Sequence, residues 1–167
     1  ILKSGNICIP LDPRIEKENF EYIAGLTEPS MILLTDDIKN RLPLDEYRCV
    51  SPSTIPEIED HHGSRFNDDT DSEMCAEIIF TSGSTGEPKG VMISHKNLIA
   101  NTSSIVEYLE LTSDDRMLVV LPFYYCYGLS LLHTHLRVGG SIVFNNSFIF
   151  LGKVIRDLTE YKCTGFA

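Results

Sequence analysis

One segment, residues 81–90, holds the side chains with the clearest chemical potential in the chain. It reads Thr-Ser-Gly-Ser-Thr-Gly-Glu-Pro-Lys-Gly and directly follows an apolar run that we expect to be a buried strand. Glycines allow backbone amides to approach a ligand closely, and successive amides in such turns form a concave anion site. The hydroxyls add hydrogen-bond donors, and Lys89 adds a positive charge that can reach a phosphate oxygen. The composition of this loop predicts a polyphosphate site.

The loop differs from the common nucleotide-binding patterns. The P-loop GxxxxGK[ST] needs a second glycine five residues after the first, a spacing that neither Gly83 nor Gly86 meets. Gly90, and not Ser or Thr, follows Lys89, and the GxGxxG pattern is absent from the sequence. These differences disfavour an ordinary P-loop NTPase. A flexible Gly/Ser linker is the non-functional alternative, which the closely flanking apolar runs disfavour.

Apolar runs and helical patterns alternate around this loop. We predict strands at 6–9, 31–34, 76–80, 91–93, 117–121 and 141–144, with an opening strand at 163–167. We predict helices from Pro13 to about Ala24, from the N-cap Ser94 to about Leu111, over 127–138 with Gly139 as its end, and over 148–162. The alternation is typical of α/β proteins with parallel-sheet layers flanked by helices, and apolar strands are expected to be covered on both faces.

Charge and composition divide the chain into three parts. Residues 1–80 contain 7 Lys or Arg and 17 Asp or Glu, whereas residues 81–167 contain 7 of each. We interpret 1–50 as the strand–helix–strand portion of one α/β subdomain, 51–75 as an acidic loop or linker, and 76–167 as an α/β portion carrying the phosphate loop. The chain begins without Met and ends on an apolar run, so we expect truncation at both ends.

Several function classes are disfavoured by the same composition. The acidic balance and the lack of a basic patch argue against a nucleic-acid surface. The five cysteines show no CxxC spacing, so we expect reduced thiols in a cytoplasmic protein. The uncharged stretch 117–136 is interrupted by Pro122 and polar residues, so we expect a buried strand and helix there and no membrane span.

No metal site is predicted either. His61 and His62 are adjacent in an acidic loop, and His133 and His135 are two apart, so that on a helix they face different sides. We expect the latter two to be core or surface histidines. The adjacent carboxylates, such as Asp114-Asp115, are interpreted as caps or turn residues.

Three segments carry a family resemblance. Residues 78–89 resemble the AMP-binding signature of the adenylate-forming superfamily of acyl- and aryl-CoA synthetases, nonribosomal-peptide adenylation domains and luciferases, and 90–98 resemble its usual continuation. Residues 2–12 resemble the family's "LKAGxxYVPLD" segment, and 121–130 resemble its "LPLFHxxGL" segment. The resemblance implies part of the large N-terminal domain of an adenylate-forming enzyme.

The resemblance also implies a reaction and its site residues. In the family, a substrate carboxylate attacks the α-phosphate of MgATP, pyrophosphate leaves, and the acyl-adenylate passes its acyl group to coenzyme A or to the pantetheine of a carrier protein. The residues implied to bind the ATP phosphates are Thr81, Ser82, Gly83, Ser84, Thr85, Gly86 and Lys89. Tyr125 stands where many acyl-CoA synthetases have His, and Tyr125 and Gly128 are candidates for the substrate pocket. Packing of the aromatic residues in a core is the alternative for Tyr125, and Gly128 is expected to permit close packing at a helix start.

Some family elements do not occur in the sequence. The adenine and ribose motifs and the small C-terminal domain with its catalytic lysine are missing. We therefore assign no catalytic residue here and expect Mg²⁺ to be held mainly through phosphates and residues outside these 167. The parent protein is expected to be an AMP-forming acid–thiol ligase, with the 167-residue chain inactive alone. The alternative is a non-catalytic α/β module that binds phosphate or acts as a scaffold.

Overall fold

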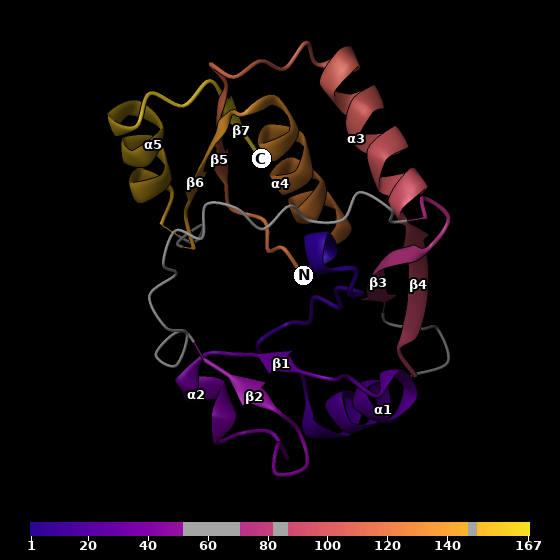
Figure 1. The fold of residues 1–167 in the computed structure, drawn as a ribbon. Helices are drawn as coiled ribbons and strands as arrows, with labels where there is room; N and C mark the ends of the chain where they lie inside the picture. The colour runs from indigo at the N-terminus through magenta and orange to yellow at the C-terminus, as the bar shows by residue number, and fades with distance from the viewer. Residues whose placement is uncertain (52–70, 82–86, 147–149) are drawn as a thin grey trace, which may run out of the picture. The chain divides into compact units, whose positions relative to one another are not determined.

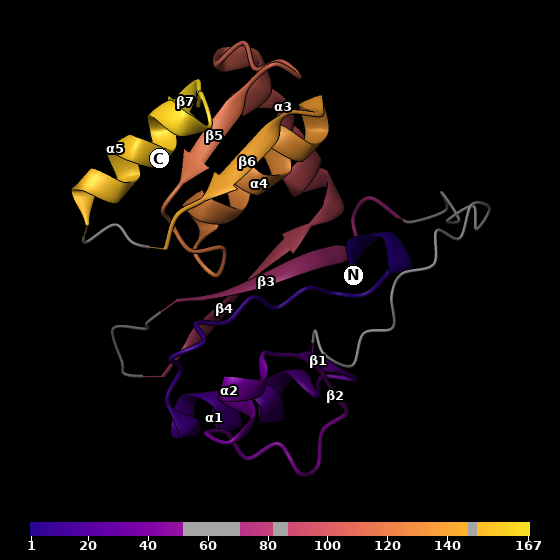
Figure 2. The same cartoon turned by 90° about the vertical axis from the view of Figure 1, so that its left-hand side faces the viewer.

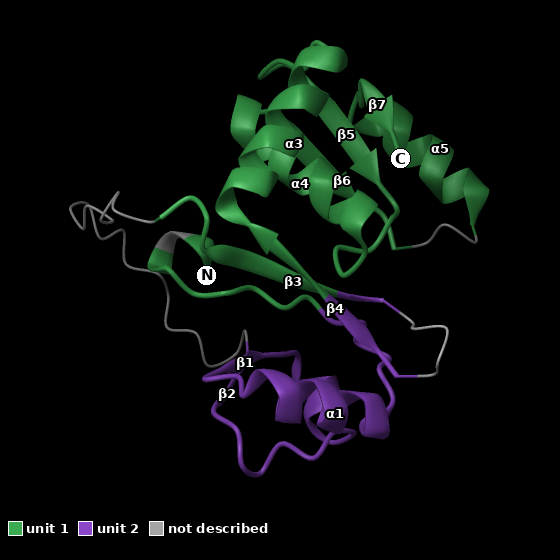
Figure 3. Cartoon of the chain, turned by 90° about the vertical axis from the view of Figure 1, so that its right-hand side faces the viewer, with its two compact units in different colours: residues 1–10, 69–79, 91–167 green, residues 11–68, 80–90 purple. Residues whose placement is uncertain are grey.

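The computed structural model describes residues 1–51, 71–81, 87–146 and 150–167. These divide into two compact units, shown in Figure 3. Unit 1 comprises residues 1–10, 69–79 and 91–167, and unit 2 comprises 11–68 and 80–90. Most of the predicted linker, residues 52–70, lies outside the described part, and the three-part division of the chain stays a prediction.

Unit 2 is built around a small parallel strand pair. Its elements are α1 (Lys17–Thr27), β1 (Ile32–Leu33), α2 (Asp36–Lys39) and β2 (Cys49–Val50), with Ile32 opposite Cys49 and Leu33 opposite Val50. The core consists of Phe20, Ala24, Leu34 and Leu44, which are all buried.

The first helix begins later than predicted. The carboxylate of Asp12 accepts the backbone N–H of Arg14 at 2.8 Å, and the carbonyl of Asp12 accepts the N–H of Ile15 at 2.9 Å. These bonds hold 12–15 in a turn, because Asp side chains compete with helical hydrogen bonding. Pro13 therefore lies in a turn before α1 and not in its first turn.

Unit 1 contains a three-stranded parallel sheet. Its elements are a 3-10 turn (Leu2–Ser4), β3 (Cys75–Thr81), β4 (Lys89–Ser94), α3 (His95–Tyr108), β5 (Arg116–Val119), α4 (Cys126–Val138), β6 (Ser141–Phe144), α5 (Leu151–Glu160) and β7 (Gly165–Phe166). The strand order is β6-β5-β7, and Leu118 lies opposite both Val143 and Phe166. Strands β3 and β4 form a separate two-stranded sheet, and the division between the units crosses both strands.

Helices cover the three-stranded sheet on both sides. Helix α4 packs on β5 and β6, and α3 packs against α4. Figures 1 and 2 show α5 on the other side of β5 and β6 from α4. The predicted burial on both faces is confirmed for β5, where Leu118 and Val119 are buried. It is wrong for the sheet-edge strand β6, where Phe144 is exposed and stacks edge-on against Phe123 at 4.8 Å.

The helix ends in unit 1 follow local sequence signals. The Ser94 hydroxyl accepts the N–H of Asn97 at 3.2 Å, and the Asn97 side chain accepts the N–H of Ser94 at 3.3 Å, which completes a capping box. Helix α4 ends at Gly139, whose φ of 73° is the left-handed conformation that glycine adopts without strain. Helix α3 ends at Tyr108, before the predicted Leu111, because Glu110 takes a positive φ of 53°.

The predicted strand at 6–9 is wrong as an extended strand. Cys8 alone pairs with β3: its N–H donates to the carbonyl of Ala76 at 2.8 Å, and its carbonyl accepts the N–H of Ile78 at 3.0 Å. Pro10 has no amide hydrogen, so the ladder cannot continue on that side. Within the described ranges, no helix is both long enough and apolar enough to cross a membrane.

Candidate functional site

The two ends of the predicted phosphate loop lie at the ends of paired strands. Thr81 is the last residue of β3 and Lys89 the first of β4. The Thr81 hydroxyl donates to the Lys89 carbonyl across 3.4 Å, a long hydrogen bond that joins the two strand ends. The five residues between them that carry predicted contacts lie outside the described ranges: Ser82, Gly83, Ser84, Thr85 and Gly86. Their role stays a prediction.

Lys89 has the properties that a phosphate ligand requires. Its residue is exposed, and among the described carboxylates none lies within ion-pair distance of its amino group. Lys96, by contrast, is paired with Glu73 at 2.7 Å. The strand pairing thus presents an uncompensated positive charge beside the glycine-rich loop, which fits a polyphosphate anion.

The third predicted motif lies at the start of α4. A Cβ atom added at Gly128 would overlap the carbonyl oxygen of Pro122 and lie 2.9 Å from its carbonyl carbon. The prediction that Gly128 permits close packing is therefore confirmed. Tyr125 is the N-cap of α4, and its N–H donates to the Pro122 carbonyl at 3.2 Å.

Two tyrosines of this motif, Tyr125 and Tyr127, are not core residues. Tyr125 is 57% exposed and Tyr127 is also exposed, so the alternative in which they pack in a core is wrong for both. The reason is the orientation of α4, which buries Leu129 and Leu131 instead. The place of Tyr125 in a substrate pocket stays a prediction.

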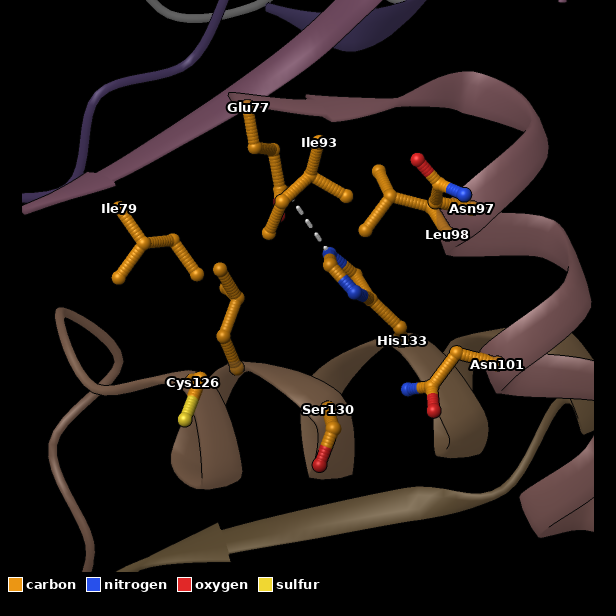
Figure 4. A pocket seen from close by; sticks show the side chains of 10 residues that line it. Glu77, Ile79, Ile93, Asn97, Leu98, Asn101, Cys126, Ser130 and His133 are labelled. Atoms are coloured by element: carbon orange, nitrogen blue, oxygen red, sulfur yellow. Dashed lines mark ion pairs between the residues drawn. The ribbon is translucent and has the colours of Figure 1, made fainter. Parts of the chain in front are cut away.

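Unit 1 also contains a pocket that sequence reasoning did not find. It has a volume of about 170 Å³ and lies between β3, β4, α3 and α4 (Figure 4). Its lining residues are Glu77, Ile79, Ile93, Asn97, Leu98, Asn101, Cys126, Leu129, Ser130 and His133. Four of the ten lining side chains are aliphatic, and a carboxylate and an imidazole are among the other six.

Glu77 and His133 form an ion pair in this pocket. Oε1 of Glu77 lies 3.0 Å from Nε2 of His133, and Glu77 is 1% exposed. Oε2 of Glu77 is buried and has no hydrogen-bond partner within the described part of the chain. A buried acceptor without a partner costs about 1–3 kcal/mol, and more when it is charged. The pKa of the neighbouring Cys8 thiol is raised, mainly by burial and secondly by the nearby Glu77.

A sequence signal for this pair did exist. Glu77 is a charged residue inside an otherwise apolar strand, and a buried charge requires a partner. Its partner could not be chosen from the sequence, because His133 and His135 both lie on α4. Only His133 reaches the carboxylate; His135 is buried and its Nδ1 donates to the Leu131 carbonyl at 2.8 Å.

The Asp114-Asp115 pair is a turn feature, as predicted. The Asp115 carboxylate accepts the Thr112 N–H at 2.7 Å and the Thr164 hydroxyl at 2.9 Å. Both hydrogen bonds lower the pKa of Asp115, and the bond from the Thr112 N–H has the larger effect.

No cluster of three or more potential metal ligands occurs in the part that the structure describes, which excludes His61 and His62. All five cysteines are free.

A comparison with models of protein families identifies the family of this chain. The model of the family described as AMP-binding enzyme matches residues 1–167. The chain belongs to the AMP-binding enzyme family. Its relatives are ligases of the adenylate-forming superfamily, and the sequence signature at 78–89 is thereby explained.

A curated relative and two solved structures illustrate this family membership. The D-alanine–D-alanyl carrier protein ligase of Listeria monocytogenes is 31% identical over 148 residues, which cover 85% of this chain and 28% of the relative. A malonyl-CoA ligase, solved with methylmalonyl-CoA and AMP, matches with a TM-score of 0.80 at 26% identity, over 99% of this chain and 35% of that one. The N-terminal domain of FACL13 from Mycobacterium tuberculosis shares the fold, with a TM-score of 0.82 at 19% identity, over 99% of this chain and 44% of that one.

These matches cover only one part of each relative's length. It spans less than a third of the length of the Listeria ligase and resembles the N-terminal domain of adenylate-forming enzymes. The predicted α/β class, with parallel sheets and helices, is confirmed.

Proposed function

We propose that the complete protein carrying this chain is an ATP-dependent, AMP-forming ligase that joins a carboxylic acid to a thiol. Family membership supports the reaction class. The observation that carries the proposal is the exposed Lys89 at the start of β4, whose amino group has no carboxylate partner among the described residues and whose carbonyl accepts the Thr81 hydroxyl at the end of β3. An ammonium group next to a glycine-rich loop in the sequence supports a site for an anion whose charge increases as it departs.

In the proposed reaction, the role of the loop is to bind the phosphates of ATP. The substrate carboxylate attacks the α-phosphorus of ATP, the bond to the bridging oxygen breaks, and pyrophosphate carries away the electron pair. Thr81, Ser82, Gly83, Ser84, Thr85, Gly86 and Lys89 hold the β- and γ-phosphates. The Lys89 charge stabilises the departing pyrophosphate more than the intact ATP, because negative charge increases there in the transition state. Mg²⁺ would be held mainly through the phosphates and supplies further charge neutralisation when bound.

The second half of the proposed reaction transfers the acyl group. The relatives' names include a carrier-protein ligase and a malonyl-CoA ligase, so the acceptor thiol is that of coenzyme A or of a carrier-protein pantetheine. Tyr125 and Gly128 are proposed to border the acid-binding pocket: Tyr125 through its exposed ring, and Gly128 by bringing α4 against the Pro122 turn. We also propose a cytoplasmic location, since five free cysteines fit a reducing compartment.

An exchange assay tests the proposed function. The complete protein would be incubated with ATP, Mg²⁺, labelled pyrophosphate and a panel of acids that includes D-alanine, malonate and fatty acids. We expect label to enter ATP only when a suitable acid is present, and AMP to accumulate once coenzyme A or a pantetheine-bearing carrier is added. Formation of ADP in place of AMP would overturn the proposal. The 167-residue chain alone is expected to show no exchange.

A further inference from the structure

The pocket between β3, β4, α3 and α4 contains a polar atom that neither the fold nor the proposed ligase reaction uses. His133 lines this pocket, and its Nε2 lies 3.0 Å from Oε1 of Glu77. Its second ring nitrogen, Nδ1, makes no hydrogen bond within the described residues. The buried side-chain atoms without a partner there are Oε2 of Glu77 and Nε2 of His135, so Nδ1 of His133 keeps accessible surface. Figure 4 shows this imidazole among the lining side chains, with one nitrogen at Glu77 and the other turned away from it.

The Glu77–His133 pair disfavours charged ligands of either sign. With a protonated imidazole the two charges cancel, and with a neutral imidazole the pair is negative, so an anion finds no net positive charge here. A cation finds no free carboxylate oxygen, because Oε1 of Glu77 is bonded to His133 and Oε2 is sealed from solvent. An ion moved from water onto an aliphatic wall without such compensation loses much of its hydration energy. The ligand of this pocket is therefore expected to be neutral.

The chemistry of Nδ1 selects the polar group of that ligand. A neutral imidazole whose Nε2–H donates to Glu77 leaves Nδ1 as an acceptor, whereas a protonated imidazole makes Nδ1 a donor. A hydroxyl group both donates and accepts, so it pairs with Nδ1 of His133 in either state. A carbonyl or ether oxygen only accepts and pairs with the protonated state alone.

The walls of the pocket select the rest of the ligand. The aliphatic side chains of the lining are Ile79, Ile93, Leu98 and Leu129. The pocket has a volume of about 170 Å³. An apolar cavity of about 150 Å³ holds benzene, so a ligand of about six non-hydrogen atoms fits. Asn97, Asn101 and Cys126 of the lining are exposed, so the pocket is open to solvent. Water bonds an imidazole nitrogen as well as an alcohol does, but only an alkyl chain also removes the aliphatic walls from water.

We propose that this pocket binds a short aliphatic alcohol, with its hydroxyl group on Nδ1 of His133 and its alkyl chain along the four aliphatic side chains. Tyr125 and Gly128, the candidates for the acid-binding pocket, do not line it, and neither does any described residue of the phosphate loop. The proposal therefore stands whether or not the ligase proposal holds.

An NMR titration of the isotopically labelled chain compares four ligands of matched size: 1-pentanol, 1-fluoropentane, butanoate and n-pentylammonium. 1-Pentanol is expected to shift the backbone amides of β3, α3 and α4 saturably, together with the Nδ1 resonance of His133. 1-Fluoropentane lacks the hydroxyl group and is expected to bind about fivefold more weakly, the effect of one neutral hydrogen bond. The two ions are expected not to bind. Equal affinities for 1-pentanol and 1-fluoropentane, tighter binding of either ion, or no shifts from 1-pentanol would overturn the proposal.

A double variant removes the proposed hydrogen-bonding partner. Glu77→Leu/His133→Leu replaces the pair by aliphatic side chains without leaving a buried carboxylate unpaired. It is expected to weaken 1-pentanol binding about fivefold and to leave the affinity for 1-fluoropentane unchanged. Unchanged affinity for 1-pentanol in the folded double variant would contradict the role of Nδ1.

A second variant tests the location of the site. Asn101→Trp introduces a large side chain at an exposed lining position of α3 and is expected to abolish binding of both neutral ligands. Ser103→Trp is the matched control, because Ser103 is exposed on the same helix and does not line the pocket. Equal binding of 1-pentanol in these two variants would place the ligand elsewhere. If the double variant does not fold, the comparison of ligands and Asn101→Trp still decide.

Discussion

Glu77 on β3 and His133 on α4 form an ion pair across 3.0 Å, in which the carboxylate is almost completely removed from solvent. The pair joins a strand to a helix that packs on a different sheet within the same unit. Because the second carboxylate oxygen has no partner among the described residues, loss of His133 would leave both carboxylate oxygens without a hydrogen-bond partner there.

Removal of the histidine is therefore expected to destabilise the chain more than removal of both partners. His133→Leu strands a buried carboxylate and should lower the free energy of unfolding by about 3 kcal/mol. The double variant Glu77→Leu/His133→Leu should lie within about 1 kcal/mol of the unmodified chain, because an apolar pair replaces the ions. Urea unfolding at neutral pH measures both. Equal losses in the single and double variants would contradict this assignment of the energy.

Lys89→Ala is expected to weaken pyrophosphate binding about tenfold, the effect of losing one charge-assisted contact of about 1.4 kcal/mol. Calorimetric titration of pyrophosphate into the chain provides the measurement. Lys96→Ala is the matched control, since that ammonium is already paired with Glu73 at 2.7 Å and should leave the affinity unchanged. A chain that binds no pyrophosphate would show that these residues alone do not assemble the site.

Gly128→Ala is expected to be among the most damaging small substitutions in unit 1. The added methyl would overlap the backbone carbonyl of Pro122, and backbone cannot move aside as a flexible side chain can. We expect a loss of about 3 kcal/mol in the free energy of unfolding. Gly152→Ala in α5, where an added Cβ meets nothing within 4 Å, should be neutral or slightly stabilising. Similar effects of the two substitutions would refute the packing role of Gly128.

Ser94→Ala is expected to cost about 1 kcal/mol, because the first turn of α3 loses the hydroxyl that accepts the Asn97 N–H at 3.2 Å. Ser104→Ala, an exposed position within the same helix, should change stability by less and in the opposite direction, since alanine has the higher helix propensity. Thermal and urea unfolding of both variants would measure this. A loss at Ser104 equal to that at Ser94 would argue against the capping box.

Acid should remove the contribution of Asp115. Its pKa in the folded chain is below the ordinary 3.8, so the group stabilises the fold above about pH 4, and this stability is lost as pH falls through the lowered value. Thr164→Val removes the 2.9 Å hydroxyl donor and should raise the pKa of Asp115 toward 3.8. NMR titration of the Asp115 carboxyl carbon reads this directly. Thr159→Val, whose hydroxyl bonds only to the Ile155 carbonyl in α5, should not move it.

Much of the fold could be predicted because its signals are local. The strand at 141–144 has the predicted bounds, and Ser94 and Gly139 begin and end helices where their side-chain and backbone chemistry indicates. The strand β2 was missed, because two residues, Cys49 and Val50, carry no periodicity. The strand predicted at 6–9 reduces to a single paired residue, since Pro10 interrupts the ladder.

The sequence by itself determined the family and the class of the fold, because the signature at 78–89 and the strand–helix alternation are contiguous patterns. Only the tertiary structure decided which residues far apart in the chain meet. Glu77 could have paired with His133 or His135, and the pitch of α4 turns His133 alone toward β3. The exposure of Tyr125 was decided in the same way, since it depends on which side of α4 meets the sheet. Which side of a helix packs against which strand depends on the whole fold, so no local pattern gave the partner of Glu77 or the exposure of Tyr125.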